Sequence, residues 1–424
     1  YNPHFTFQKA ELIPSKLGTN QSRVEFRVLP NFYVYGANSQ VAIDDLLYPK
    51  VETIDKNIDG LNGSTIFGAG IEVPFLSVSY KIGKDKELMT LALSNNTRVL
   101  ANTIVGDKLL KLLWNGNKQF EGQVIDFGKF GASSIAATEI NLGWAMPIDI
   151  NSELSMRVGA NFKYLLAMNG AYVPESNATM ETKTGGKAII FNDLSYQADV
   201  AYMEEGSMFS GRGFGVDLSA TVNINEDMDA SLAILDLGKL SFSKNTHSYS
   251  GGGNVTFEGV VWANIFEDHE FNADSLLRED INSETDSNHT FSMSLPTRMV
   301  LHFEKRIMDT DGNVKHGMYL TYIQGLNNIA GATKRPYIAA GYSYSYKNIV
   351  NVGPTINYGG YAGFGMGMFL SAKPGPFRIG VGTNTGLSYL FMPGSARSVD
   401  FSLMTTWSIG KNKKNVPETA PSID

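Results

Sequence analysis

The sequence predicts an all-β protein, a transmembrane antiparallel β-barrel of about 14 strands, with 12 and 16 strands as alternatives. Three observations lead to this fold class. Apolar and polar residues alternate with a period of two along most of the 424 residues, as in strands that face two different environments. The alternating segments run roughly 9 to 12 residues, whereas globular strands average roughly 5 to 6 and a bilayer crossing takes about ten. Short polar turns and longer loops rich in Gly, Ser and Asn separate them, which is how outer-membrane barrels are connected.

Composition excludes several classes of function. The chain has no Cys, so disulfide frameworks, thiolate metal sites and Cys nucleophiles are excluded. It carries 35 Lys and Arg against 42 Asp and Glu, a net charge of −7, and no basic cluster as dense as a phosphate backbone requires. Nucleic acid is therefore not an expected partner. Because 43% of the residues are hydrophobic and only 18% are charged, disorder over most of the chain is excluded as well.

Residues 1–60 are expected to form an N-terminal arm or a partial plug of the lumen. Pro14, Pro30 and Pro49 interrupt this stretch, and Pro cannot donate to a β-ladder. The first residues lack the basic start and the apolar stretch of a secretory signal. For an exported barrel, this implies that Tyr1 is a mature N-terminus whose signal peptide has been removed, and that the protein is located in the cell outer membrane.

Residues 61–410 are expected to form the barrel. In residues 213–224, Phe, Val, Leu, Ala and Ile occupy every second position, and Gly, Asp, Ser, Thr and Asn occupy the positions between them. Residues 154–164 and 298–306 show the same dyad. Residues 348–372 are the longest uncharged stretch, but six Gly, three Asn and a Pro break its hydropathy, so strands are predicted there and a membrane helix is not.

Two further segments are set apart from the strands. Residues 262–288 form an acidic insert, with eight Asp or Glu and one Arg between Glu267 and Asp286. A short helix is expected over residues 273–280, with Asp274 as its N-cap. The sequence does not place this insert on one side of the membrane. Residues 411–424 are expected to form a polar tail without a core-forming pattern.

A soluble β-sandwich or β-propeller would also show alternation, because one face of each strand packs in a core. Two features favour the membrane. The polar faces carry mainly Gly, Ser, Asn and Thr, whereas a strand facing water would carry more Lys and Glu. Aromatic residues also gather at segment ends, as at Trp144, Tyr164 and Trp407, where a barrel has its interfacial girdles.

Four motifs occur in a fixed order along the chain: ELIPSK (11–16), RVLPNFYVYGANSQVAIDDLLY (27–48), LMTLALSNNTRV (88–99) and GRGFGVDLSATVNINEDMDASLAILDLGKLSF (211–242). In this order they resemble a Bacteroidota family of outer-membrane barrels of unassigned function, distantly related to the outer-membrane long-chain fatty-acid transporters. The sequence departs from the family in lacking an Asn-Pro-Ala start and in extending past the last strand. The resemblance implies a barrel fold and no fixed substrate.

Enzymatic activity is not expected. The patterns GxSxG, HExxH and the P-loop are absent. Of the six His, only His302 is predicted on a lumen face, with Glu304 beside it, and a hydrogen-bond network of the lumen explains this pair more simply than catalysis. The segment Asp309–Asn313 begins like a calcium loop but lacks the closing Glu, and a hairpin turn explains it. No metal and no cofactor is therefore expected.

Charged residues on the polar faces of the predicted strands are the candidate site residues, because these faces point into the lumen. Their signs are mixed, so they can pair with one another, and an open pore is not implied. The lumen-lining candidates are Glu139, Arg157, Lys163, Asp217, Arg298, His302, Glu304, Arg306, Arg378 and Asp400.

Two functions remain open. In the first, the protein is a transport or porin-like barrel that passes small or hydrophobic solutes, with the N-terminal arm as its gate. In the second, a closed barrel acts as an accessory or structural subunit of a larger outer-membrane export or surface complex. The expected partners are the lipid bilayer with its lipopolysaccharide and, for the second function, other outer-membrane proteins. An apolar lumen groove lined by the arm would favour transport, and a salt-bridged plug with an apolar patch on the loops would favour the accessory role.

Overall fold

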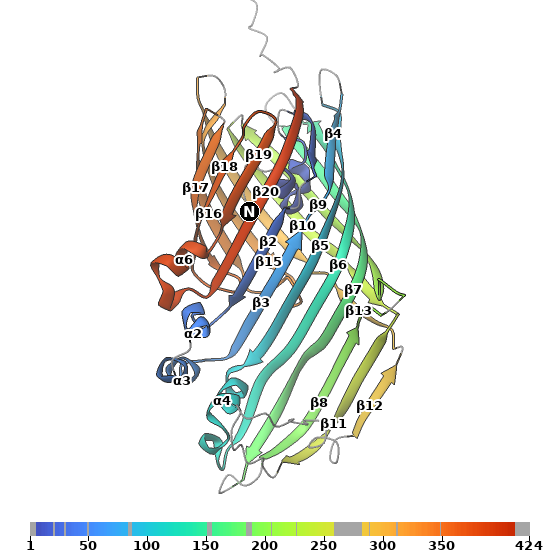
Figure 1. The fold of residues 1–424 in the computed structure, drawn as a ribbon, viewed down its shortest axis with the longest axis vertical. Helices are drawn as coiled ribbons and strands as arrows, with labels where there is room; N and C mark the ends of the chain where they lie inside the picture. Colours follow the sequence, from blue (N-terminus) through green and yellow to red (C-terminus); the bar gives the residue numbers. More distant parts are fainter. Residues whose placement is uncertain are drawn as a thin grey trace, which may run out of the picture.

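Twenty strands in the described part of the chain form one continuous antiparallel sheet that closes into a barrel (Figure 1). The barrel has 14 strand positions, which confirms the predicted fold class and excludes the sandwich and the propeller. It closes because β20 (Ser398–Lys411) pairs with β19 (Phe377–Thr383) on one side and with β1 (Ser22–Arg27) and β2 (Phe32–Asn38) on the other. The structure is a computed structural model and describes residues 6–19, 22–28, 31–48, 51–83, 87–150, 155–183, 189–204, 206–225, 227–257, 282–287, 289–310, 313–347 and 349–411.

Three barrel positions are each shared by two strands that follow one another. Strands β1 and β2 run consecutively along β20, β3 (Ser64–Val73) and β4 (Ser77–Ile82) along β5, and β13 (Phe291–Ser294) and β14 (Arg298–Met308) along β10. The remaining barrel strands are β5 (Met89–Gly106), β6 (Val124–Asp149), β7 (Ser155–Thr182), β9 (Gly211–Asn225), β10 (Met228–Phe242), β15 (Val314–Gly325), β16 (Tyr337–Tyr346), β17 (Val350–Gly359) and β18 (Gly365–Ala372).

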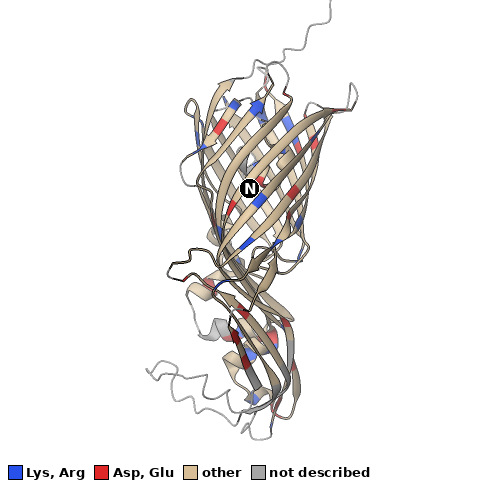
Figure 2. Ribbon diagram, turned by 90° about the vertical axis from the view of Figure 1, so that its right-hand side faces the viewer, with Lys and Arg blue, Asp and Glu red and all other residues tan. Residues whose placement is uncertain are grey.

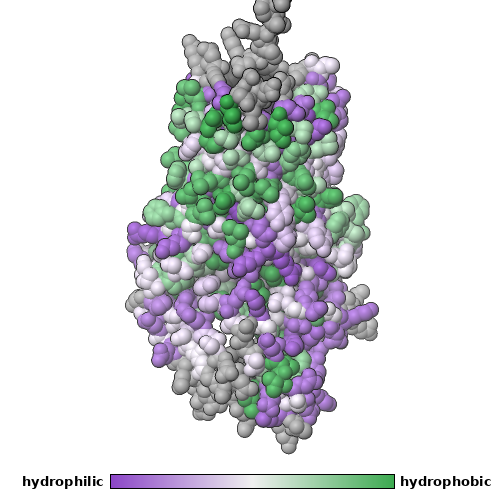
Figure 3. Space-filling view, turned by 180° about the vertical axis from the view of Figure 1, so that it is seen from behind, coloured by the Kyte–Doolittle hydropathy of each residue, from purple (hydrophilic) through white to green (hydrophobic). Residues whose placement is uncertain are grey.

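The period-two pattern sorts side chains between the lumen and the outer surface. Ser231, His302 and Thr321 align across β10, β14 and β15 and are all buried. Their neighbours Leu232 and Leu301 are 46% and 45% exposed on the outside. Figure 3 shows hydrophobic side chains gathered over the barrel and hydrophilic ones below it. The barrel is therefore apolar outside and polar inside, the reverse of a soluble protein.

Charged residues occur at intervals along the barrel strands (Figure 2). The turn predicted between two strands at Asp309 is a hairpin turn between β14 and β15. The Asn313 amide donates to the Asp309 side chain at 2.8 Å, and the Asp309 amide donates to the Asn313 carbonyl at 2.8 Å. This arrangement is the ordinary use of an Asx residue in a turn.

The N-terminal segment lies inside the barrel. It consists of α1 (Thr6–Leu12) and the single 3₁₀ turn η1 (Pro14–Lys16), and Ser15, Lys16 and Leu17 are each at most 3% exposed. The paired strands begin at Ser22, so the arm is shorter than the predicted residues 1–60. The prediction placed β1 and β2 in the arm because the prolines suggested broken pairing, whereas these strands have their own register with β20.

An extension of the sheet projects beyond one end of the barrel (Figure 1). Strands β6 and β7 have 26 and 28 residues, far more than a bilayer crossing requires. Their far ends continue into β8 (Ile189–Ala201), β11 (Thr246–Phe257) and β12 (Asn282–Ser287). The amphipathic helix α4 (Asp107–Asn115) and the turn η2 (Lys118–Phe120) cover this end, where Leu109 and Leu112, one helical turn apart, pack against Ile125 and Phe127.

Short helices occupy the same end as the extension (Figure 1): α2 (Ile43–Leu47), α3 (Val51–Asp59), α6 (Gly386–Phe391) and the 3₁₀ turn η3 (Pro393–Ser395). No helix of the described residues is long and apolar enough to cross a membrane. The helix predicted over residues 273–280 lies outside the described residues, as do residues 412–424 of the predicted tail. Of the acidic insert, residues 282–287 form β12.

Candidate functional site

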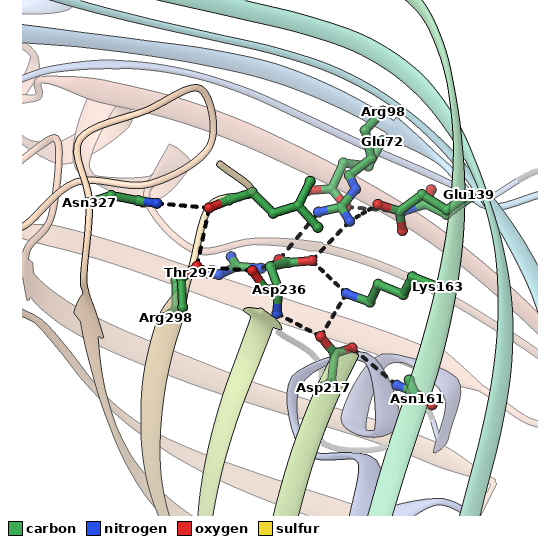
Figure 4. Close-up of polar contacts among 12 residues, drawn as sticks. Glu72, Arg98, Glu139, Asn161, Lys163, Asp217, Asp236, Thr297, Arg298 and Asn327 are labelled. Atoms are coloured by element: carbon green, nitrogen blue, oxygen red, sulfur yellow. Dashed lines mark hydrogen bonds and ion pairs between the residues drawn. The ribbon is translucent and has the colours of Figure 1, made fainter. Parts of the chain in front are cut away.

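One half of the lumen is filled by paired charges, and Asp236 lies at the centre of the first cluster (Figure 4). A β-bulge in β10 places Asp236 at a φ of 56° with no side-chain exposure. Its carboxylate pairs with Lys163 of β7 at 2.6 Å, Arg298 of β14 at 3.0 Å and Arg98 of β5 at 3.1 Å. The bulge thus brings cations from three other strands onto one buried anion.

Further anions complete this cluster. Asp217 of β9 pairs with Lys163 at 2.8 Å and accepts the Asp236 amide at 2.7 Å, and Glu139 of β6 pairs with Arg98. Buried charges are stable only when they are paired and hydrogen-bonded, and these requirements are met within the wall itself. This wall, from β5 to β14, is called the charged half below.

A second cluster of the charged half holds the N-terminal segment. Lys16 pairs with Glu304 of β14 and with Asp229 of β10, both at 2.7 Å, and Lys9 pairs with Glu304 at 3.2 Å. Arg306 pairs with Asp229 at 2.6 Å. Burial lowers the pKa of the Lys9 ammonium, and the Glu304 carboxylate opposes that shift. These ion pairs attach the segment to two neighbouring barrel strands.

The backbone of the segment is fixed to the same wall. Arg157 of β7 donates to the carbonyl oxygens of Ser15 and Leu17 at 3.0 and 2.6 Å. The Ser15 hydroxyl lies 2.7 Å from the Thr221 hydroxyl of β9. A Cβ atom at Gly159 would lie 2.5 Å from the Ser15 nitrogen, so the segment is seated where the wall has no side chain. We call residues 9–17 the plug.

An apolar core lies in the same half of the sheet, on β5, β6, β7, β10 and β13. Phe242 and Phe291 stack there with ring centroids 4.8 Å apart, and Ile329 and Ala330 of the β15–β16 loop belong to the same buried cluster. Gly170 makes room for the Phe242 ring, because a Cβ there would collide with it. Ion pairs and apolar packing therefore leave this half with little free volume.

The opposite half contains a cavity of about 380 Å³. Its wall is built mainly from β2, β15, β16, β17 and β20, and the plug closes one side through Glu11 and Leu12. Inward positions here carry short side chains such as Ala339, Thr355 and Thr405 where the charged half has Arg, Lys and Glu. We call this the hollow half. Its aromatic lining consists of Phe32, Tyr33, Tyr35, Tyr319, Tyr337 and Tyr361.

A smaller polar pocket of about 90 Å³ lies between the plug and β5, β6 and β7. Glu11, Glu72 and Arg298 line both spaces. Glu11 pairs with the buried Arg27 at 3.1 Å, and Glu72 accepts from Asn96 at 3.3 Å. These three side chains stand where the hollow half meets the charged half.

The structure places the sequence-predicted residues in different roles. Glu139, Lys163, Asp217 and Arg298 belong to the Asp236 cluster, and Arg157, Glu304 and Arg306 belong to the contacts around the plug, as the preceding distances show. The His302 side chain is buried, with Nδ1 2.8 Å from the Thr321 hydroxyl and Nε2 3.8 Å from Glu304.

Two predicted residues lie apart from both clusters. Arg378 is on β19 opposite Thr406. Asp400 of β20 accepts the backbone amides of Asn384 and Thr385 at 2.8 and 2.7 Å, and therefore shapes the loop at the rim of the cavity. In the described chain, no group of three or more His, Asp or Glu side chains could hold a metal ion.

Sequence reasoning missed Asp236, Asp229, Arg98 and the lysines of the plug. Asp236 had a recognisable signal in the sequence, because polar residues fall on odd positions at Asp229 and Ser231 and on an even position at Asp236. Such a change of phase indicates a bulge. The plug lysines had no such signal, since neither α1 nor η1 shows the alternation that marked the strands.

Comparisons with known proteins give no function directly. No curated protein matches the chain. The fold is similar to the Ralstonia pickettii toluene transporter TbuX (10% identity, 95% of this chain and 93% of that chain, TM-score 0.44) and the Pseudomonas putida toluene transporter TodX (9%, 97% and 94%, 0.46). It is also similar to a Pseudomonas aeruginosa FadL homologue (11%, 94% and 93%, 0.41). Structural similarity at these identities and TM-scores does not assign the function of one protein to another.

A family model matches the sequence itself over most of its length. The model describes a family of unknown function, DUF5723, and it matches residues 17–384, from the end of the plug to the loop before α6. Because this match includes most of the chain, the protein belongs to the DUF5723 family.

Proposed function

We propose that the protein is an outer-membrane barrel that binds small, largely apolar solutes in its hollow half and passes them across the membrane, with the plug as its gate. The observation that carries this proposal is the cavity of about 380 Å³ inside a closed barrel, lined by six aromatic residues and bounded by the plug. Ligand sites are typically concave, mostly apolar and 300–1,000 Å³ in volume.

The outer surface supports the membrane location. Leu91, Phe162, Leu320 and Ile356 are between 40% and 54% exposed on four different barrel strands, and exposing them to water would forgo about 25 cal/mol for each Å² of apolar surface. A bilayer removes that cost. The Bacteroidota origin and the contact with lipopolysaccharide that the sequence implies remain predictions, as does the absence of enzymatic activity.

A double-Cys lock tests the gate. The chain has no native Cys, and the hydroxyl oxygens of Ser15 and Thr221 are 2.7 Å apart, so the variant Ser15→Cys/Thr221→Cys would tie the plug to β9. We expect single-channel conductance in planar bilayers to be lost on oxidation and restored on reduction. Deletion of residues 1–17, which leaves β1 intact, should raise the conductance. Conductance that is the same in the oxidised, reduced and deleted forms would refute the gate.

A second candidate function is supported by other observations. The plug is ion-paired to the wall. At the end of the barrel that carries the extension, α2 with the residue after it and α6 expose apolar side chains: Leu46 (51%), Leu47 (60%), Tyr48 (67%), Leu390 (71%) and Phe391 (70%). Exposed apolar patches mark contact surfaces. A closed barrel that serves as an accessory subunit of a larger outer-membrane complex would use this surface for a protein partner. Absence of conductance in all three forms of a folded, heat-modifiable barrel would favour this role.

A further inference from the structure

We propose that the hollow half takes a small aromatic molecule that carries a hydrogen-bond acceptor, such as an aromatic ketone, on a surface made by Tyr35 and Tyr361. This inference rests on the proposed function and deepens it by naming the class of ligand. Three observations carry it: the seating of the two rings, the geometry of the loop that holds Tyr361 and the unpaired donors of the cavity.

Both rings lie against glycines of β3. A Cβ atom at Gly68 would lie 2.6, 2.7 and 2.8 Å from three atoms of the Tyr361 ring, so the ring rests with its face on the backbone. A Cβ atom at Gly70 would lie 2.5 Å from Cε1 and 2.9 Å from Cζ of Tyr35. The two ring centroids are 6.5 Å apart, and both residues line the cavity. The glycines therefore seat two rings against the wall. Tyr33 stacks beside Tyr35 with ring centroids 5.6 Å apart, so a planar molecule in the cavity would meet an aromatic surface.

The loop between β17 and β18 holds Tyr361 in place before any ligand arrives. Gly359, Gly360 and Gly363 have φ values of 98°, 59° and 73°, which residues with a side chain rarely adopt. The amides and carbonyls of Gly359 and Gly363 bond each other at 2.9 and 3.2 Å. This loop carries Tyr361 from the β17–β18 end of the wall to Gly68 on β3. A ring that is already fixed loses little conformational entropy on binding.

The polar groups of the cavity leave donors without partners. Among the described residues, the buried Tyr361 hydroxyl and the buried Arg298 Nε have no hydrogen-bond partner, and both residues line the cavity. The Asp400 and Asn31 side chains are instead bonded to the protein itself. A ligand whose acceptor reaches either group would satisfy it, and a buried donor that gains a partner favours binding. A plain hydrocarbon supplies none.

Three probes separate the ring from the acceptor. Acetophenone has both, ethylbenzene has only the ring, and 2-octanone has only the acceptor on a linear chain. Binding to the full chain in detergent is measured by equilibrium dialysis against the same detergent. We expect acetophenone to bind at least about fivefold more tightly than either of the others, because each of the others lacks one contact, and fivefold corresponds to about 1 kcal/mol.

Two substitutions assign the contacts. Tyr361→Phe keeps the ring and removes the hydroxyl, so it should weaken acetophenone about five- to tenfold and leave ethylbenzene unchanged. Gly68→Ala displaces the ring from its seat and should weaken both aromatic probes. The matched control is Tyr358→Phe, since Tyr358 is 65% exposed at the end of the neighbouring β17 and should change nothing. Heat-modifiable migration on a gel shows that each variant is folded.

Each departure from this pattern has a defined meaning. Equal affinity for ethylbenzene and acetophenone would refute the requirement for a hydrogen-bond acceptor. Binding of 2-octanone as tight as that of acetophenone would refute the requirement for an aromatic ring. An unchanged acetophenone affinity in Tyr361→Phe would overturn the role of that hydroxyl. If no probe binds while the plug lock still controls conductance, the ligand class is wrong and the proposed function stands. If acetophenone binds as expected but conductance never responds to the lock, the site stands and the gate fails.

Discussion

The two halves of the lumen differ in how their interior space is occupied. Both are walls of one barrel with inward polar positions, but the charged half fills its space with Arg, Lys, Asp and Glu that reach one another and the plug. The hollow half combines Ala, Gly and Thr with aromatic residues along its wall and contains a cavity of about 380 Å³. The difference teaches that side-chain length at inward positions decides whether a barrel of this size is filled or open.

Energetic consequences should follow the same division. A substitution in the charged half disturbs buried ion pairs or tight packing, whereas a substitution in the hollow half meets free space. We therefore expect large losses of stability from the first and losses of ligand binding from the second. Four predictions test this contrast, from the largest effect to the smallest.

Removing the central anion should have the largest effect. Asp236→Asn leaves Arg98, Lys163 and Arg298 around a neutral group, and breaking a buried ion pair costs about 3–5 kcal/mol. The free energy of unfolding in lipid vesicles, from urea titration followed by gel mobility, measures this loss. Asp227→Asn in the exposed β9–β10 turn is the control and should be neutral. A loss for Asp236→Asn as small as the control's would mean that the cluster is hydrated and weakly coupled.

A methyl group placed under the plug should come next. Gly159→Ala puts a Cβ atom 2.5 Å from the Ser15 nitrogen, and overpacking costs about 1–3 kcal/mol. We expect the plug to shift, so that the Ser15→Cys/Thr221→Cys pair oxidises less completely in this background. Gly36→Ala on β2 is the matched control, because no atom lies within 4 Å of the added Cβ there. Equal cross-linking in both backgrounds would show that the plug is held loosely.

The same enlargement in each half should have opposite outcomes. Ala233, 1% exposed, packs with Leu235 and Val300 in the charged half, so Ala233→Leu should destabilise the barrel by about 1–3 kcal/mol. Ala339, 7% exposed, borders the cavity, so Ala339→Leu should change stability by less than about 1 kcal/mol and lower acetophenone affinity at least about tenfold. Urea titration and equilibrium dialysis separate the two readouts. Equal destabilisation at both positions would refute the contrast.

An ion pair outside the lumen should matter least. Glu175 of β7 and Lys129 of β6 lie 2.9 Å apart on the extension, with side chains 33% and 60% exposed. The hydrogen bond from Lys129 lowers the pKa of Glu175, so the contribution of the pair exists at neutral pH and fades as the pH falls through that lowered pKa. We expect Lys129→Gln to shift the urea midpoint barely at pH 7 and not at all at pH 2–3. A shift of the urea midpoint that increases as the pH falls would contradict this prediction.

The sequence by itself determined the fold class and predicted about 14 strands, with 12 and 16 left open. Period-two alternation over segments of bilayer length needs only local chemistry, because neighbouring positions of a strand face different environments. It also identified inward charges such as Arg157 and Glu304, because the alternation within a strand assigns each position to one of the two faces. The boundary of the arm was misjudged, because Pro14, Pro30 and Pro49 were read as breaks in pairing, although β1 and β2 form in the intervals between them.

Only the tertiary structure decided which inward charges meet and where the lumen stays empty. Asp236 turns inward because of a bulge, and its cations come from residues 98, 163 and 298, far apart in the chain. Tyr361 reaches Gly68 across almost 300 positions of sequence because the barrel closes on itself. Alternation reports the environment of each strand face, but pairing and free volume depend on distances between strands, which no local pattern contains.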